Sequence, residues 1–330
     1  MARRKFKILN NFGDFVCLTL AKFETYTDPM GKVSLLAGAL CLALVALMDP
    51  AALRAQALQR SVYASALDQS GAPVPNLGPT DFIVREDKVA REILTVAPAT
   101  DPMQIALLVD NSQAGEQYTR DYREALPTFI RTIAADESGA RHQVSVITIA
   151  ERPTINTDYT FDLPLAIKGA ERIFGVPGSG SYLLDGIIET SQAITKKSLT
   201  RPVIVAVTTE GPELSDRQYQ TVLEPLRESG ASLHVITVGN PRNNNYDRSV
   251  VIDMGTRDTG GRNDVLMTGN ALTTRLKQLA TELTHQYRVT YARPDTLIPP
   301  EQVTVSAAKP GMTVRGIAMK TMRDRDRERP

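Results

Sequence analysis

The sequence predicts an α/β fold: a doubly wound, mostly parallel sheet with a small β-sandwich-like domain built from N- and C-terminal flanking strands. Apolar runs of five or six residues recur between residues 105 and 238, separated by segments with a helical apolar period. Shorter runs that alternate between apolar and polar residues flank this region on both sides. Continuous apolar strands are typical of parallel sheets buried on both faces, and alternating strands are typical of half-exposed antiparallel sheets.

The composition excludes several classes of function. Lys and Arg (38) balance Asp and Glu (37), so the chain carries no basic excess for nucleic acid, and we predict no nucleic-acid partner. Cys17 and Cys41 are the two cysteines, which leaves the rest of the chain without a disulfide or a thiol nucleophile. The histidines, His142, His234 and His285, are far apart and form no HExxH motif, which argues against a histidine-based metal enzyme.

Residues 1–57 are predicted to be a leader with a signal peptide. The apolar run Val33 to Met48 is shorter than the about 20 residues of a membrane-spanning helix. Ala55-Gln-Ala57 is a small-x-small triplet of the kind that signal peptidase cuts after. Met30 would open a compact signal peptide, so we hypothesise that it is the true start. These features predict export to the periplasm, the cell surface or the medium, with membrane contact only through this segment if it is uncleaved.

An N-terminal β segment is predicted over residues 58–100. Its strand candidates, separated by turn signals, are Arg60–Leu67, Phe82–Asp87 and Glu92–Val96.

The α/β domain is predicted over residues 101–285, where apolar strands alternate with helical patterns. The four strand candidates are Ile105–Val109, Val144–Ile149, Val203–Val207 and Leu233–Val238. The helix candidates are Tyr118–Ala135 with a kink at Pro127, Leu183–Ile194, Asp216–Ser229 with Ser215 as N-cap, and Ala271–Thr284.

A C-terminal β segment over residues 286–320 is predicted to pair with residues 58–100. Its strand candidates are Tyr287–Tyr291, Gln302–Ser306 and Met312–Ile317. Residues 321–330 alternate in charge without an apolar residue, which indicates a solvated tail.

Polar side chains follow the predicted parallel strands. Asp110 and Ser112 follow the first apolar strand, and Glu210 follows the third. Ser181 lies in a Gly/Ser-rich loop that precedes a helix. Ligands of open α/β sheets bind beyond the carboxyl ends of the strands. Carboxylates and hydroxyls are hard oxygen donors, which suit Mg²⁺ or Ca²⁺ better than zinc.

These segments, in this order, resemble a von Willebrand factor type A domain. The matching segments are Ile105–Ser112, the Gly178–Tyr182 loop before Leu183–Asp185, Val207–Gly211, Leu233–Gly239, Thr259–Arg262 and Leu276–Tyr287. With the flanking strands, the chain is similar to the bacterial VWFA-related proteins known from acidobacteria. The resemblance spans about Arg60 to Met319. It implies protein recognition or adhesion, in which a bound divalent ion is completed by an acidic group of the partner.

The resemblance also implies a set of metal ligands. The family motif is Asp-x-Ser-x-Ser with a Thr and an Asp from later loops. Asp110 and Ser112 match, and Ser181 stands where the Thr would be. Glu210 stands where the Asp would be, one methylene longer, and Ala114 offers no side-chain oxygen at the third motif position. The implied ion is Mg²⁺ or Ca²⁺, and Ca²⁺ tolerates irregular geometry better.

Structural roles for the same residues remain open. The alternative for Asp110 is to accept hydrogen bonds from loop amides only, and the alternative for Asn111 or Ser112 is to cap the following helix. The alternative for Glu210 is a solvated turn residue.

Two further polar segments are predicted at the surface. Asn243–Asn245, with Arg242 and Arg248, predicts a flexible loop suited to contacts. Asp258 and Asp264, which flank two glycines, are predicted turn residues.

The sequence therefore predicts an exported, non-enzymatic protein that binds an unknown protein partner, with a degenerate ion site at Asp110, Ser112, Ser181 and Glu210. One alternative is a scaffold whose ion site is not functional. The other is a metal-assisted hydrolase that uses Asp110 and Glu210, for which no motif places a histidine or lysine base nearby.

Overall fold

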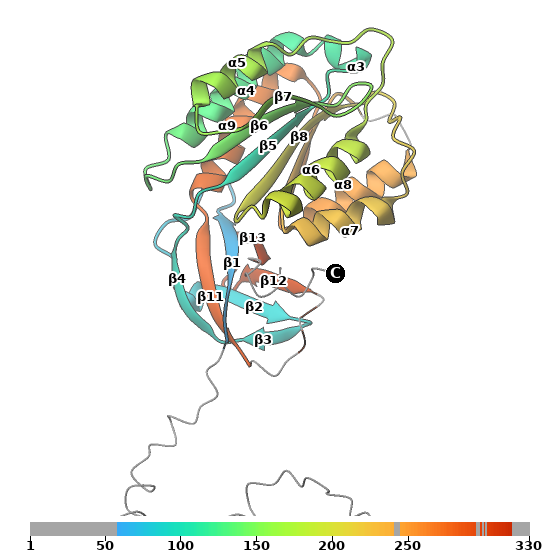
Figure 1. Ribbon diagram of the computed structural model, residues 1–330. Helices are drawn as coiled ribbons and strands as arrows, with labels where there is room; N and C mark the ends of the chain where they lie inside the picture. Colours follow the sequence, from blue (N-terminus) through green and yellow to red (C-terminus); the bar gives the residue numbers. More distant parts are fainter. Residues whose placement is uncertain (1–57, 241–244, 295–297, 299, 301, 319–330) are drawn as a thin grey trace, which may run out of the picture. The chain divides into compact units, whose positions relative to one another are not determined.

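The computed structural model describes residues 58–240, 245–294, 298, 300 and 302–318 (Figure 1). The described residues all belong to one compact unit. The predicted leader and charged tail lie outside the described residues, so both stay predictions, as do the domain boundaries. Among the helices that are described, none is long and apolar enough to cross a membrane.

A six-stranded sheet forms the centre of the α/β region, with the strand order β10-β9-β8-β5-β6-β7. Its strands are β5 (Gln104–Val109), β6 (Gln143–Thr148), β7 (Thr154–Thr160), β8 (Pro202–Thr209), β9 (Ser232–Val238) and β10 (Asn263–Leu266). Only β7 pairs antiparallel within this sheet. The central strands β5, β8 and β9 are buried along their whole length because helices cover both faces, which confirms the predicted doubly wound sheet.

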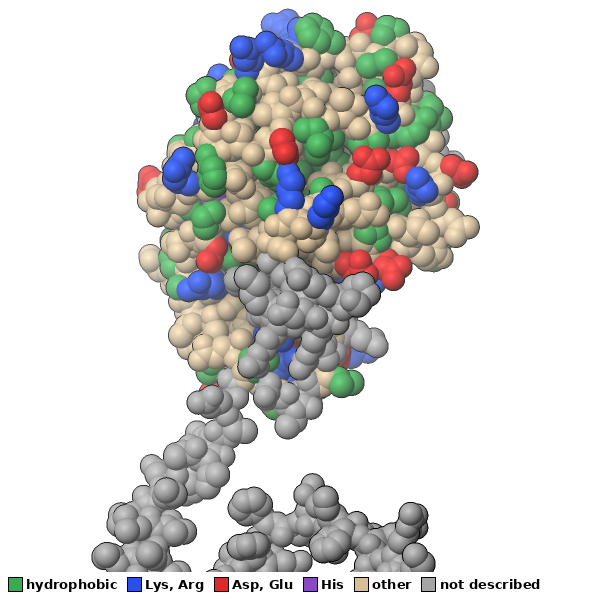
Figure 2. Space-filling model, viewed as in Figure 1, with side chains coloured by type: hydrophobic (Ala, Val, Ile, Leu, Met, Phe, Trp, Pro, Cys, Tyr) green, Lys and Arg blue, Asp and Glu red, His purple; other side chains and the backbone are tan. Residues whose placement is uncertain are grey.

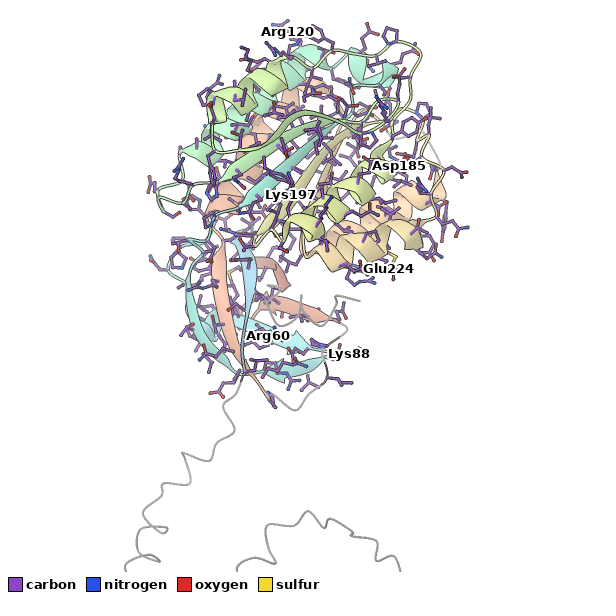
Figure 3. All side chains as sticks on the ribbon, in the orientation of Figure 1. Arg60, Lys88, Arg120, Asp185, Lys197 and Glu224 are labelled. Carbon is purple, nitrogen blue, oxygen red and sulfur yellow. The ribbon has the colours of Figure 1, made fainter. Side chains whose placement is uncertain are left out.

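Helices cover both faces of this sheet (Figure 1). The helices α4 (Thr119–Ala134), α5 (Leu163–Glu171) and α9 (Leu272–Thr284) pack on one face around a core that contains Tyr122 and Phe129. The helices α6 (Leu183–Lys197), α7 (Tyr219–Ser229) and α8 (Tyr246–Asp258) pack on the other. In Figure 3, Asp185 and Lys197 lie at opposite ends of α6, which runs from the carboxyl edge of the sheet to its amino edge.

Three local predictions are wrong. The third predicted helix begins at Tyr219, with Gln218 as N-cap, because the Ser215 hydroxyl instead accepts the Asp185 N–H at 3.1 Å. Arg248, predicted in a surface loop, lies in the first turn of α8 and is 4% exposed. Asp264, predicted in a turn, lies in β10 and pairs with Arg262 at 2.8 Å.

The flanking segments form two antiparallel sheets. A four-stranded sheet has the order β13-β1-β11-β4, and a three-stranded sheet has the order β12-β2-β3. Their strands are β1 (Leu58–Leu67), β2 (Phe82–Glu86), β3 (Val89–Arg91), β4 (Ile93–Pro98), β11 (Tyr287–Arg293), β12 (Val303–Ala307) and β13 (Thr313–Ala318). The strand β1 pairs with β11 and β13, and β2 pairs with β12, so strands from both ends of the chain combine as predicted. The two sheets share one apolar core, which includes Phe82, Val84 and Tyr291.

The turn between α8 and β10 approaches β9 so closely that it requires glycine. A Cβ on Gly261 would lie 1.8 Å from the Leu233 carbonyl oxygen. We expect Gly261→Ala to lower the free energy of unfolding by about 1–3 kcal/mol, because a backbone strand must move aside. Urea unfolding measures this. Gly78→Ala is the control, because Gly78 has a φ of −123° and no atom closer than 4.0 Å, and it should be neutral or stabilising. An equal loss in both variants would contradict the prediction.

Candidate functional site

Asp110 is the centre of the polar cluster at the carboxyl edge of the central sheet. It follows β5 directly and is fully buried. Its Oδ1 accepts the Ser112 N–H at 3.0 Å. Its Oδ2 accepts the Thr209 N–H at 3.1 Å and the Thr209 hydroxyl at 2.6 Å. Asp110 therefore ties β5 to β8, and accepting bonds from loop amides is one of the structural roles that the sequence left open.

Ser112 and Ser181 are buried beside this cluster, and neither hydroxyl has a hydrogen-bond partner among the described residues. Ser112 is the N-cap of α3 (Gln113–Glu116), but its side chain does not cap the helix. The two loops are joined, because Gln113 N–H donates to the Ser179 carbonyl at 3.4 Å. A buried hydroxyl without a partner is costly, so these two groups mark a polar site.

Glu210, the fourth predicted ligand, places its carboxylate beside the end of β9. A Cβ placed on Gly239 would lie 2.2 Å from Glu210 Oε2 and 3.0 Å from the Tyr118 hydroxyl. The Glu210 carboxylate therefore lies against Gly239 and Tyr118, past the end of β9. Burial, helped by the charge of Glu210, raises the pKa of Tyr118.

Arg248 brings a positive charge to this edge of the sheet. Its Nη2 donates to the Thr209 carbonyl at 2.6 Å and to the Thr208 hydroxyl at 3.0 Å. Burial lowers the pKa of this guanidinium, and the charges of Glu213 and Asp110 oppose that shift. Sequence reasoning did not predict that Arg248 is buried at this edge. A signal was present, because Asn245 is a typical N-cap residue, and its Oδ1 accepts the Arg248 N–H at the start of α8.

Glu213 is a second buried carboxylate that sequence reasoning missed. It accepts the Leu183 N–H at 3.2 Å and the Ser215 N–H at 3.1 Å. It thereby caps the first turn of α6, where the helix dipole favours a negative charge. Burial raises the pKa of Glu213, and the bonds from Ser215 and the charge of Arg248 oppose the rise.

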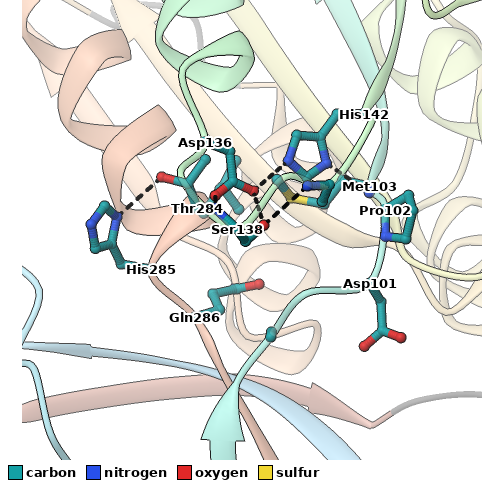
Figure 4. A network of polar contacts seen from close by, with 12 residues as sticks. Asp101, Pro102, Met103, Asp136, Ser138, His142, Thr284, His285 and Gln286 are labelled. Atoms are coloured by element: carbon teal, nitrogen blue, oxygen red, sulfur yellow. Dashed lines mark hydrogen bonds and ion pairs between the residues drawn. The ribbon is translucent and has the colours of Figure 1, made fainter.

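The three histidines lie toward the opposite, amino edge of the sheet. His142 immediately precedes β6, and its Nδ1 accepts the Met103 N–H at 3.0 Å (Figure 4). The neutral ring therefore carries its proton on Nε2, which donates to Asp136 at 2.8 Å. His285 follows α9, and His234 lies in β9 with neither ring nitrogen hydrogen-bonded. None of them serves the Asp110 cluster as a base.

The residues present fit a divalent ion poorly. The free hydroxyls of Ser112 and Ser181 are suitable donors. Ala114 supplies no oxygen, and a Cβ on the facing Gly211 would lie 2.5 Å from the Ala114 Cβ, so this corner is packed with carbon. Of the two predicted carboxylate ligands, Asp110 accepts a bond from the Ser112 N–H, whereas Glu210 lies against Gly239. Within the described residues, no group of three or more His, Cys, Asp or Glu side chains is arranged so that it could hold a metal ion.

Apolar side chains line the loops at this edge. Phe174 precedes the Gly/Ser loop, Leu214 follows β8, Tyr246 opens α8 and Met267 follows β10. Each is about half exposed or more, from 49% for Leu214 to 69% for Tyr246. We call these four residues the apolar rim. Large exposed apolar side chains near one another are typical of a protein-binding surface.

The comparisons with known proteins find similar folds among solved structures but no similar sequence. No protein-family model matches the sequence, and no curated protein matches it. The solved structures that resemble it include von Willebrand factor type A domains. BatB from Bacteroides thetaiotaomicron is 12% identical, with 55% of this chain and 98% of that chain covered and a TM-score of 0.42. A von Willebrand factor type A protein from Catenulispora acidiphila is 10% identical, with 80% and 74% covered and a TM-score of 0.46.

A third similar structure carries a metal. It is proximal thread matrix protein 1 from the mussel byssus with a zinc-occupied MIDAS motif, which is 11% identical. The match covers 60% of this chain and 49% of that chain, with a TM-score of 0.44. At such low identities, no residue role is taken from these structures.

Proposed function

We propose that this chain is an exported, non-enzymatic module that recognises a protein partner through the loops at the carboxyl edge of its central sheet. The observation that carries the proposal is the apolar rim, whose residues lie in loops at the same edge of the sheet as the buried Asp110. The resemblance of the sequence to von Willebrand factor type A domains supports the same use of this edge.

Three of the four rim residues come from connections that follow adjacent strands of the sheet. Met267, Tyr246 and Leu214 follow β10, β9 and β8, which are adjacent in the sheet. Phe174 lies beside the end of β5, because its carbonyl accepts a bond from Asn111 Nδ2 at 2.9 Å. Tyr246 is held edge-on against Tyr219, with ring centroids 6.2 Å apart. A pre-positioned aromatic ring contributes binding energy at a small entropic cost.

A protein partner fits this surface better than nucleic acid does. Lys and Arg side chains are interspersed with Asp and Glu on the face that Figure 2 shows, without a broad basic patch. Phosphate backbones require clustered positive charge. The carboxylates of the buried Asp110 and of Glu210, beside Gly239, also oppose an anionic ligand at this edge.

The hydrolase alternative has less support. Glu210 lies against Gly239 and Tyr118, and both oxygens of Asp110 accept hydrogen bonds, so the two carboxylates do not converge on a water. A scaffold that needs no ion remains compatible with the same surface. Export rests on the predicted signal peptide in residues 1–57.

A photo-crosslinking experiment tests the proposed recognition surface. We expect a benzophenone amino acid at position 214 or 246 to capture one discrete protein in cells that produce the chain, because both positions lie on the apolar rim. The same amino acid at Glu137, an exposed position between α4 and β6 at the amino edge, is the control. Immunoblotting and mass spectrometry identify the adducts. Equal capture from Glu137, or no adduct from either rim position, would reject this surface.

A further inference from the structure

We infer that Arg248, and not a resident divalent ion, supplies the positive charge that balances the buried Asp110 at the carboxyl edge of the sheet. This inference does not depend on the partner or on the apolar rim. It changes what the degenerate motif means: the chain has replaced the cation of an ion site with one of its own side chains.

The first support is a shared contact. The Thr209 carbonyl accepts a hydrogen bond from Arg248 at 2.6 Å. The N–H and the hydroxyl of Thr209 both donate hydrogen bonds to Asp110. One residue at the end of β8 therefore joins the guanidinium to the carboxylate. Arg248 is 4% exposed and Asp110 is fully buried, so water screens neither charge.

The second support is the balance of charge. Asp110 and Glu213 are both buried carboxylate residues at this edge. A buried carboxylate without a compensating cation is strongly unfavourable. Arg248 comes from α8, whereas both acids lie in other segments of the chain. Its hydrogen bonds to Thr208 and Thr209 hold the guanidinium against the end of β8. The guanidinium of arginine stays charged and is more weakly hydrated than the ammonium of lysine, so it suits a buried position better.

The third support is the donor set that an ion would need. The third motif position is Ala114, packed against Gly211, and Glu210 lies against Gly239 instead of Asp110. Mg²⁺ requires near-octahedral oxygen ligands. With Arg248 present, Asp110 and the hydroxyls of Ser112 and Ser181 remain as the oxygen donors of that set.

The test uses thermal unfolding of the full chain in EDTA or in millimolar Mg²⁺, Ca²⁺ or Mn²⁺. An ion that binds only the folded state raises the midpoint by mass action. We expect no shift of the wild-type midpoint with any ion. Arg248→Met should lower the midpoint in EDTA by about 5–10 °C, because Asp110 loses its compensating charge. The divalent ions should then recover part of that loss, since Asp110, Ser112 and Ser181 are left to bind them.

Matched variants keep the result interpretable. Arg248→Met with Asp110→Asn should show no ion response, and its loss should be smaller than the sum of the two single losses, which reports coupling between the charges. Arg248→Lys keeps the positive charge, so its unfolding midpoint should not respond to divalent ions. This variant replaces Arg248→Met in the test if Arg248→Met does not fold. Arg257→Met, an exposed arginine on the same helix, should change neither the midpoint nor the ion response.

Two outcomes would overturn the inference. One is a wild-type midpoint that rises with a divalent ion and no longer rises in Asp110→Asn. The other is strict additivity of Arg248→Met and Asp110→Asn in EDTA. Neither outcome bears on the crosslinking result, so this inference and the proposed recognition surface fail separately.

Discussion

Replacing Arg201 with methionine should lower the free energy of unfolding by about 3–5 kcal/mol. Arg201 is 3% exposed, and it joins the α/β region to the β sandwich. Its Nη1 donates to the Asp101 carbonyl at 2.7 Å, and its Nη2 donates to the Leu283 carbonyl at 3.1 Å and to Gln286 Oε1 at 2.8 Å. The guanidinium also lies 4.6 Å from the centroid of the Tyr63 ring in β1.

The size of the effect follows from what the substitution leaves behind. Methionine matches the length of the arginine stem but offers no donor, so the Asp101 and Leu283 carbonyls and the Gln286 amide oxygen lose their partner. Gln286 also donates to Ser65 Oγ in β1, so the loss reaches a second element of the sandwich.

Denaturant unfolding with a two-state fit measures the Arg201 effect. Arg288→Met is the matched control, because Arg288 is 45% exposed and makes one long ion pair with Asp101 at 3.5 Å. An exposed pair of this kind contributes about 0–1 kcal/mol. If Arg201→Met costs no more than Arg288→Met, the buried network is not what joins the two regions.

Lowering the pH from 7 to 4 should cost about 3 kcal/mol of stability through His234 alone. Burial lowers the pKa of this imidazole from 6.5 to about 4. The folded state therefore holds the ring neutral, whereas the unfolded chain protonates it. The stabilisation is fully present above pH 6.5 and is lost as the pH falls toward 4, where the folded protein also takes up the proton.

The charged side chains around His234 also affect its pKa and therefore the pH range over which stability is lost. Glu282 and Asp264 favour the protonated ring, and Arg315 and Arg262 oppose it. The pKa of Glu282 itself is lowered, because Arg315 and the neighbouring charges outweigh its burial. Its contribution is present above its unfolded pKa and is lost at lower pH, so it adds to the acid sensitivity below the range of His234.

The variant His234→Leu isolates the effect of His234. Neither ring nitrogen has a hydrogen-bond partner, so an apolar side chain removes no bond and should leave stability at pH 7 unchanged or higher. Unfolding free energies at pH 7, 5.5 and 4 should fall less steeply in this variant. His285→Gln, at an exposed position after α9, should follow the wild type. A variant with the wild-type pH slope would exclude His234 as the source.

The sequence by itself determined the four central strands of the six-stranded sheet. Continuous apolar runs such as Ile105–Val109 occur where both faces of a strand are buried, so the local sequence alone predicts such a strand. The edge strand β7 escaped prediction because most of its residues are at least partly exposed, so its sequence lacks an apolar run. The same reasoning located Asp110 and Ser112 at a strand end, since chain order alone places them there.

The tertiary structure decided what those strand-end residues do. Nothing in the sequence around Glu210 shows that its carboxylate lies against Gly239, because that contact joins the ends of two neighbouring strands. Arg248 read as a loop residue, since its burial depends on Thr208 and Thr209, about 40 positions away in the chain. Periodicity records which residues are buried, but charges are compensated through space by residues distant in sequence, so only the packed chain fixes the partner of each buried charge.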